Sequence, residues 1–310
     1  MPRPPSRALV RSLIVLLCLI WGSTWIVIRG GLTDLPPFTG AAARFLLGAV
    51  VVALLAPWLA RAEGGGRPTA RLSLTMGTLN IGASYALVYW SETILPSGLV
   101  AVLWAAHPMM LGALSVWLLP QERLVGRQWA GLVVGFLGIV LLFVTDLSGL
   151  GPGAIPAGLL LLGSPAVAAL GNLLIKRDGA GTSSVLLNRN GFLIGGVLLA
   201  LLALATESGS GTTWSPGAVG SVLYLSLVGS VLAFGLYFWL LRHAPAYELG
   251  LISYVTPIIA LLLGATLGDE RLGWERLLGT ACVLAGVALV LTGRRRAAHA
   301  APPPSRGAGR

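Results

Sequence analysis

Charged residues are scarce in this chain. Only 10% of its 310 residues are Asp, Glu, Lys or Arg, whereas 55% are hydrophobic. This composition lies far from that of soluble domains and predicts a chain whose partner is the lipid bilayer. The formal charge of +10 does not indicate a nucleic-acid partner, because the cations lie between apolar runs and at the chain ends rather than along one face.

Cysteine, histidine and lysine are also rare, which excludes several function classes. Cys18 and Cys282 each lie inside an apolar run, so we expect no disulfide framework, no metal site and no cofactor. Lys176 is the sole lysine and does not belong to a Gly-Lys-Ser/Thr loop, which excludes an ATP-driven machine within this chain. No H-x-x-x-H or G-x-S-x-G motif occurs, so we expect no catalytic residues, and an intramembrane lipid-modifying enzyme or hydrolase is a minor alternative.

What the chain has in abundance is long apolar runs. A helix needs about 17 to 25 residues to cross the hydrocarbon core of a bilayer. Runs of this length lie near residues 9–29, 38–60, 72–92, 97–119, 127–145, 156–176, 185–205, 217–241, 246–268 and 273–292. Short turn-rich connections separate them. The sequence therefore predicts an all-α integral membrane protein with ten transmembrane helices.

The positive charges predict the orientation of these helices. If the N-terminus is cytoplasmic, all of the 21 Lys and Arg residues fall on the inner side except Arg29, Arg44, Arg271 and Arg276. This separation satisfies the positive-inside rule. We therefore expect a multi-pass protein of the cell membrane with both termini in the cytoplasm.

The chain also contains an internal repeat. Residues of one type recur 149 positions apart, namely Trp90 and Trp239, Pro96 and Pro245, and Pro108 and Pro257. The sequence Glu122-Arg123-Leu124 recurs 148 positions later as Glu270-Arg271-Leu272. Because each half holds an odd number of spans, the two copies must have opposite orientations. We predict two inverted five-helix repeats, at residues 1–145 and 146–296, followed by a disordered cytoplasmic tail at residues 297–310.

Inverted repeats favour transport, because two similar halves can exchange conformations and open a central site to either side in turn. Gene duplication that only builds a stable bundle is the alternative. The polar and aromatic residues deep in the spans favour transport over that alternative.

The chain resembles the EamA family of the drug/metabolite transporter superfamily. The resemblance covers about Leu13 to Leu291 and rests on Trp21-Gly22-Ser23-Thr24-Trp25, Pro37, Arg44, the stretch from Pro108 to Glu122, and the second copy at Pro257, Glu270-Arg271-Leu272 and Gly279 to Gly286. It implies a carrier, often an exporter, of amino acids or other small metabolites. It also implies a pathway lined by spans one, three, four, six, eight and nine.

One departure from symmetry concerns the sixth span, which carries Gly171-Asn172 where the first span carries Thr24-Trp25. The lining of the two halves is therefore expected to differ, and Asn172 becomes a candidate site residue.

Polar and aromatic residues inside apolar runs are the site candidates, because burying an unpaired polar group is costly. Trp21, Thr24 and Trp25 share one face of the first span, with packing as an equal alternative. Asn80 and Ser84 share a face of the third span, beside a stripe formed by Tyr85, Tyr89 and Glu92. We expect Glu92, near the outer end, to be solvated.

The fourth span adds Trp104, His107 and Pro108, and the proline is expected to break the helix. His107 could take part in proton coupling, although a structural histidine is favoured. The repeat places Ser253, Tyr254 and Pro257 in a matching break of the ninth span, and Tyr237 is a candidate in the eighth.

Arg44 lies inside the second span, where its side chain could extend to the outer headgroups or attract an anionic substrate group. The expected partner is a small-molecule substrate, and a carrier of lipid-linked or hydrophobic drug-like substrates is the main alternative. The sequence leaves the oligomeric state open.

Overall fold

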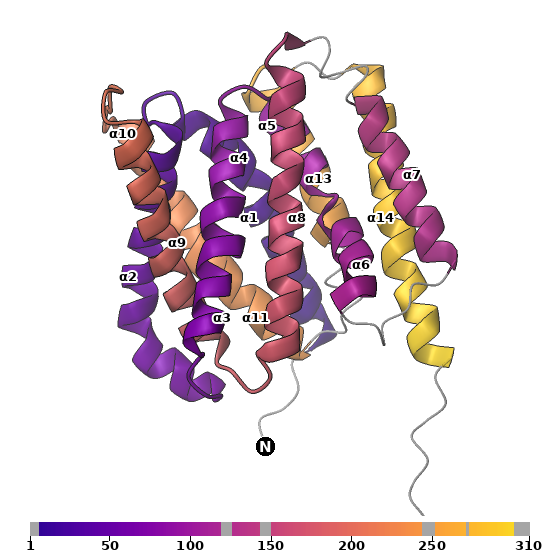
Figure 1. Ribbon diagram of the computed structural model, residues 1–310, viewed down its shortest axis with the longest axis horizontal. Helices are drawn as coiled ribbons and strands as arrows, with labels where there is room; N and C mark the ends of the chain where they lie inside the picture. Colours follow the sequence, from indigo (N-terminus) through magenta and orange to yellow (C-terminus); the bar gives the residue numbers. More distant parts are fainter. Residues whose placement is uncertain (1–5, 119–125, 143–149, 244–251, 271–272, 301–310) are drawn as a thin grey trace, which may run out of the picture.

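The computed structural model describes residues 6–118, 126–142, 150–243, 252–270 and 273–300. The described residues form ten helical segments that run up and down through one bundle (Figure 1). Six of the described helices are individually long and apolar enough to cross a membrane. The predicted all-α membrane fold with ten transmembrane helices is confirmed.

The first repeat contains five segments. They are α1 (Arg7–Gly31), α2 (Pro37–Glu63), a composite of α3 (Ala70–Thr75), η1 (Met76–Ala83) and α4 (Ser84–Glu92), the pair α5 (Ser97–Trp104) and α6 (His107–Leu118), and α7 (Gly126–Leu142).

The second repeat follows the same order. Its segments are α8 (Ala154–Asp178), α9 (Ser184–Thr206), a composite of α10 (Pro216–Leu223), η4 (Tyr224–Leu232) and α11 (Ala233–His243), α13 (Ile252–Leu267), and α14 (Trp274–Ala300).

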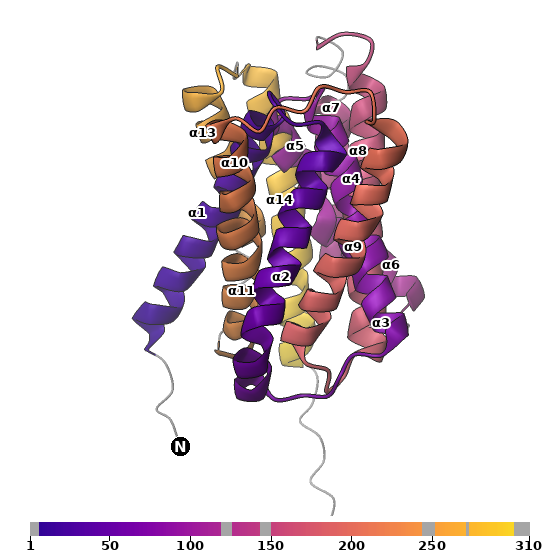
Figure 2. The ribbon, with the colours of Figure 1, turned by 90° about the vertical axis from the view of Figure 1, so that its left-hand side faces the viewer.

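The two repeats enter the bundle from opposite ends. In Figures 1 and 2, α1 begins and α2 ends at the lower end of the bundle, whereas α4 ends and α8 begins at the upper end. The predicted inversion is confirmed. The helix α14 reaches Ala300, so it includes the first four residues assigned to the tail, and residues 301–310 lie outside the described chain.

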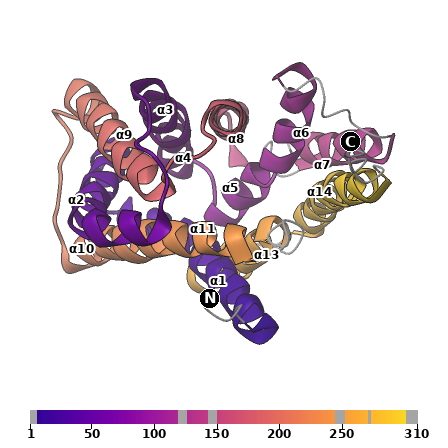
Figure 3. The same ribbon diagram turned by 90° about the horizontal axis from the view of Figure 1, so that it is seen from below.

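Helices of one repeat pack against helices of the other. The pairs are α2 with α9, α7 with α14, α1 with α13, and α6 with α8. Seen from below, α2 and α9 lie at one edge of the bundle and α7 and α14 at the opposite edge (Figure 3). Glycine permits the second contact, because a Cβ atom on Gly286 would lie 2.5 Å from the backbone nitrogen of Gly135.

Two glutamates cap the α2–α9 pair reciprocally. The carboxylate of Glu207, just after α9, accepts hydrogen bonds from the backbone N–H groups of Phe38 at 2.7 Å and Thr39 at 2.8 Å, at the start of α2. The carboxylate of Glu63, at the end of α2, accepts from Ser184 at 3.1 Å and Val185 at 3.0 Å, at the start of α9. A carboxylate near a helix N-terminus satisfies free N–H groups and interacts favourably with the helix dipole.

The third segment of each repeat contains a stretch of π-helix. The stretch η1 begins at Met76 and η4 begins at Tyr224, 148 positions later, which is within one position of the offset of 149 that relates Trp90 to Trp239 in the same segments. A π-helical turn is rare and is found frequently at functional sites, because it changes the direction of the side chains that follow.

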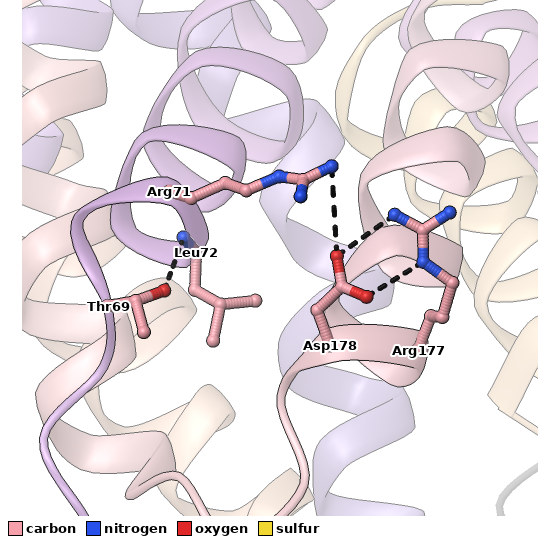
Figure 4. A network of polar contacts seen from close by, with 5 residues as sticks. All are labelled: Thr69, Arg71, Leu72, Arg177 and Asp178. Carbon is pink, nitrogen blue, oxygen red and sulfur yellow. Dashed lines mark hydrogen bonds and ion pairs between the residues drawn. The ribbon is translucent and has the colours of Figure 1, made fainter.

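A polar network lies at the lower end, between α3 and α8 (Figure 4). Thr69 caps α3 by accepting a hydrogen bond from the backbone N–H of Leu72 at 3.2 Å. Asp178 pairs with Arg177 at 2.7 Å and lies 3.9 Å from Arg71. Such exposed ion pairs stabilise a fold weakly.

Candidate functional site

The fourth segment is interrupted in the middle of the bundle. Helix α5 ends at Trp104, a turn follows at Ala105 and Ala106, and α6 begins at His107. Pro108 is the second residue of α6. The first N–H groups of a helix have no acceptor within the helix, so the missing N–H group of proline costs no helical hydrogen bond there. In the second repeat, by contrast, α13 passes through Pro257 as a continuous helix, so the matching break expected there is absent from the described residues 252–267.

Side chains from three segments meet beside this interruption. We call them the polar cluster, which consists of Asn80, Ser84, Trp104, His107, Ser164 and Asn172. The amide of Asn80 on η1 donates to Oδ1 of Asn172 on α8 at 2.6 Å, and to the backbone carbonyl of Ala168 at 3.3 Å. The amide nitrogen of Asn172 lies 3.1 Å from Nε2 of His107. A chain of polar groups therefore links both repeats.

Aromatic rings border the polar cluster. The rings of Trp104 and His107 are stacked, with centroids 5.1 Å apart and planes inclined by 3°. The indole N–H of Trp104 donates to Ser164 at 3.1 Å, and Ser164 in turn lies 2.9 Å from the hydroxyl of Ser84. Trp25 of α1 contacts the other side, with its ring centroid 6.1 Å from that of Trp104. The cluster combines hydrogen-bonding groups with flat apolar surfaces.

The cluster has capacity for a further partner. Asn172 is exposed, while Asn80 and His107 are half-buried. The oxygen Oδ1 of Asn80 has no hydrogen-bond partner among the described residues. A buried carbonyl of this kind is costly unless water or a ligand satisfies it.

Gly171 provides the space for Asn80. A Cβ atom at this position would lie only 2.0 Å from Oδ1 of Asn80. The Gly171-Asn172 pair distinguishes the sixth span from the first. Gly171 leaves room for the amide of Asn80, and Asn172 accepts a hydrogen bond from that amide.

A second group of residues surrounds Arg44. Its side chain is 2% exposed and points into the bundle rather than to the surface. Its Nε donates to the hydroxyl of Ser230 at 3.0 Å, and its guanidinium carbon lies 4.9 Å from the ring centroids of both Phe45 and Tyr85. Tyr85 therefore belongs with Arg44, although it follows Ser84 in the sequence. Of the two roles considered for Arg44, extension to the headgroups does not occur.

A third group lies on α1. The ring of Trp21 contacts Phe234 and Tyr237, with centroids 5.8 Å and 5.5 Å apart. The hydroxyl of Thr24 donates to the backbone carbonyl of Trp21 at 2.7 Å, so it is used by its own helix. Trp21 and Tyr237 thus come together, whereas the hydroxyl of Thr24 bonds to its own helix.

The remaining candidates lie in α13. The backbone of Ser253 and Tyr254 is helical, and their side chains lie outside the described part of the structure.

Sequence reasoning missed two features. Ser164 joins the polar cluster, and only the position of a serine within an apolar run could have indicated it. Glu92 was expected to be solvated, but the structure buries it completely. The correction has a physical reason, because α1, α2, α5 and α8 all pack against α4, the helix that ends at Glu92.

A cleft of about 250 Å³ opens between α2, α9 and α11. Its walls are mainly apolar and include Val52, Leu59, Asn188, Phe192, Phe234 and Gly235. The cleft lies in the lower half of the bundle, close to Glu63.

The fold and these buried groups define a polytopic membrane protein with a polar interior, and comparisons with known proteins define it further. The sequence profile of the EamA-like transporter family matches residues 10–144 and 155–292. The chain belongs to this family and is a membrane transporter.

Named relatives agree with this assignment. The chain is 32% identical over 293 residues to the uncharacterized inner membrane transporter YedA of Escherichia coli K12. This alignment covers 90% of this chain and 89% of that protein. It is 27% identical over 300 residues to the probable amino-acid metabolite efflux pump of the same organism, covering 91% and 95% of the two chains. It is also similar to the uncharacterized transporter YvbV of Bacillus subtilis, with 27% identity over 282 residues and 90% of each chain covered.

A solved crystal structure shares the fold. The TM-score is 0.65 at 19% sequence identity, and the alignment covers 94% of this chain and 99% of that one. The names of the relatives are those of transporters or efflux pumps rather than of enzymes.

Proposed function

We propose that this protein is a secondary transporter that exports amino acids or other small metabolites by alternating access. The observation that carries the proposal is the polar cluster, which is built on an interrupted helix where spans three and four meet span six. Inverted-repeat transporters bind their substrates between the repeats, at broken helices. A relative named as a probable amino-acid metabolite efflux pump supports the substrate class.

The chemistry of the cluster suits a small polar molecule. Two amides and an imidazole supply both donors and acceptors, and Oδ1 of Asn80 offers one acceptor without a partner among the described residues. The indole rings of Trp25 and Trp104 supply apolar surface, and an indole also attracts an ammonium group. Energy for transport would come from a gradient.

Flux through proteoliposomes tests this proposal. Purified protein should exchange radiolabelled amino acids across the membrane, and Asn80→Ala or Trp104→Ala should abolish exchange. Thr78→Ala is the matched control, because Thr78 lies in the same π-helical stretch and its hydroxyl donates only to its own helix, to Leu74 at 2.8 Å. Exchange that survives both cluster substitutions would contradict the site.

The apolar cleft favours a second candidate, a carrier of hydrophobic or lipid-linked substrates. Gly235 lines this cleft, and a Cβ atom there would meet nothing within 4 Å. Gly235→Phe would therefore place a phenyl ring in the cleft from a position with free space at Cβ. Under the second candidate this change should stop transport of amphipathic compounds, whereas amino-acid exchange through the polar cluster should continue.

The proposed orientation places the lower end in the cytoplasm. In a chain with Cys18 and Cys282 replaced by Ala, a membrane-impermeant thiol reagent applied to intact cells should label Gly209→Cys at the upper end. It should leave Ser6→Cys at the lower end unlabelled until the cells are opened. The reverse pattern would invert the topology.

A further inference from the structure

The most isolated charge-bearing group in the described structure is the carboxyl group of Glu92. It belongs to the last residue of α4, has 0% exposure, and neither of its oxygens has a hydrogen-bond partner among the described residues. An ionised carboxylate that is buried without hydrogen bonds costs several kcal/mol in proteins, whereas the neutral acid costs much less.

Three other buried or half-buried glutamates show that this isolation is not general. Glu63 and Glu207 accept the backbone hydrogen bonds that cap α9 and α2. Glu270 accepts from the backbone N–H groups of Ser97 at 2.6 Å and Gly98 at 3.0 Å, at the start of α5. Each of these carboxylates is placed where an ionised group is stabilised.

The charged groups around Glu92 come from three elements. Arg29 of α1, Glu270 beyond α13, and Arg44 of α2 interact with it electrostatically, and Tyr89 lies one turn earlier on its own helix. Helices α5 and α8, which also pack against α4, carry no charged residue in their upper turns.

Neither arginine donates a hydrogen bond to the carboxyl oxygens of Glu92. Arg29 donates through Nη1 to the backbone carbonyl of Glu92 and, at 3.1 Å, to that of Leu95, so it binds the chain and not the carboxylate. Arg44 donates through Nε to Ser230, and its Nη1 is buried without a hydrogen-bond partner among the described residues.

We propose that Glu92 is a proton-binding site of this transporter, occupied while the helices packed against α4 bury it completely, as in this structure. Opening of the upper end admits water, and the carboxylic acid then releases its proton to that water and becomes a carboxylate. When the end closes again, the carboxylate takes a proton back from water before it is buried.

The direction of the linkage follows from these two states. The closed arrangement binds one proton more than the open one, so acid on the upper side favours closure and rising pH favours opening. Because Glu92 attracts Arg29 and Arg44 when ionised, its charge also changes how α1 and α2 interact with α4. The consequence for flux rests on the proposed transport function, whereas protonation of Glu92 does not.

Infrared spectroscopy of the full-length protein in proteoliposomes tests protonation directly. The wild-type protein at neutral pH should show a carbonyl stretching band of a protonated carboxylic acid. Glu92→Gln should lose this band, and Glu92→Asp should keep it at a shifted frequency. Glu207→Gln is the matched control at the same end of the bundle and should retain it, because the carboxylate of Glu207 accepts hydrogen bonds at the start of α2.

A band that persists in Glu92→Gln, or no such band in the wild-type protein, would overturn the proposal. If Glu92→Gln does not fold, the shift in Glu92→Asp alone decides the assignment, because only the carboxyl that was changed can shift. Flux adds a second measurement: wild-type exchange should change severalfold with pH on the upper side, and Glu92→Gln should respond less than twofold. Absence of flux in the wild type would reject the transport function while leaving the infrared result intact.

Discussion

The two repeats share their backbone plan but differ in what they place at their centre. Both third segments contain a π-helical stretch at nearly equivalent positions, yet η1 carries Asn80 where η4, at the offset of 149 that relates Trp90 to Trp239, carries Gly229. The fourth segment is interrupted before His107, whereas its counterpart α13 runs continuously through Pro257. The pairs of helices are symmetric, and the polar cluster is not.

This difference shows that the symmetric helix packing and the asymmetric polar side chains serve separate purposes. Reciprocal contacts, such as the two glutamate caps, need the same residue type in both halves. A binding site for an asymmetric molecule needs donors and acceptors on particular sides, so one copy of each mirrored position has become polar and the other has remained apolar.

Substitutions in the two π-helical stretches, at Asn80 of η1 and at Val228 of η4, should produce the largest difference between the repeats. Asn80→Val removes the hydrogen bonds to Asn172 and Ala168 and should lower exchange at least tenfold, since about 1.4 kcal/mol corresponds to a factor of ten. Val228→Asn should leave exchange within about threefold if expression is normal. Equal losses in proteoliposome assays would show that the halves contribute alike.

A methyl group at Gly171 should have the next largest effect. Gly171→Ala places a Cβ atom 2.0 Å from Oδ1 of Asn80, so the amide must move away from Asn172. We expect a severalfold loss of exchange, measured at matched protein amounts. Gly30→Ala on α1 is the control, because nothing lies within 4 Å of its Cβ position. Full activity of Gly171→Ala would mean that the Asn80–Asn172 bond is dispensable.

The two prolines should differ in a smaller but measurable way. Pro108→Ala supplies an N–H group and should favour a continuous helix, which would reduce exchange by about twofold to fivefold. Pro257→Ala should change exchange little, because α13 is already continuous. A larger effect at Pro257 would place the moving part in the second repeat.

Substitution of the two capping glutamates should give the smallest effect, and the loss of stability should be the same for both. Glu63→Ala and Glu207→Ala each leave two backbone N–H groups without their acceptor, which costs about 1 to 3 kcal/mol in stability. Thermal unfolding in detergent should show similar decreases in Tm for both variants. Unequal decreases in Tm would show that the two caps contribute differently to stability although their hydrogen bonds are alike.

Much of the fold is predictable from local sequence. Apolar runs define the segments, and the repeated Trp, Pro and Glu-Arg-Leu positions define two inverted halves. The π-helical stretches are not predictable in this way, because residues 76–83 carry no pattern that separates them from an α-helix. Their conformation depends on packing against other segments.

The candidate site is predictable only as a set of residue types. Asn80, Trp104, His107 and Asn172 are all polar or aromatic residues in apolar runs, and they meet in the structure. Arg44, Trp21 and Tyr237 satisfy the same criterion but lie in other groups, because their helices face other partners.

The sequence by itself determined the number of segments and their inversion, because both follow from composition and spacing along the chain. Tertiary structure decided which polar groups have partners. Asn80 and Asn172 are 92 positions apart and bond directly, while the carboxyl group of Glu92, near the predicted surface of the membrane, is enclosed without a hydrogen bond among the described residues. Burial and hydrogen bonding depend on neighbours that come from distant parts of the chain, and only the packed bundle brings those neighbours together.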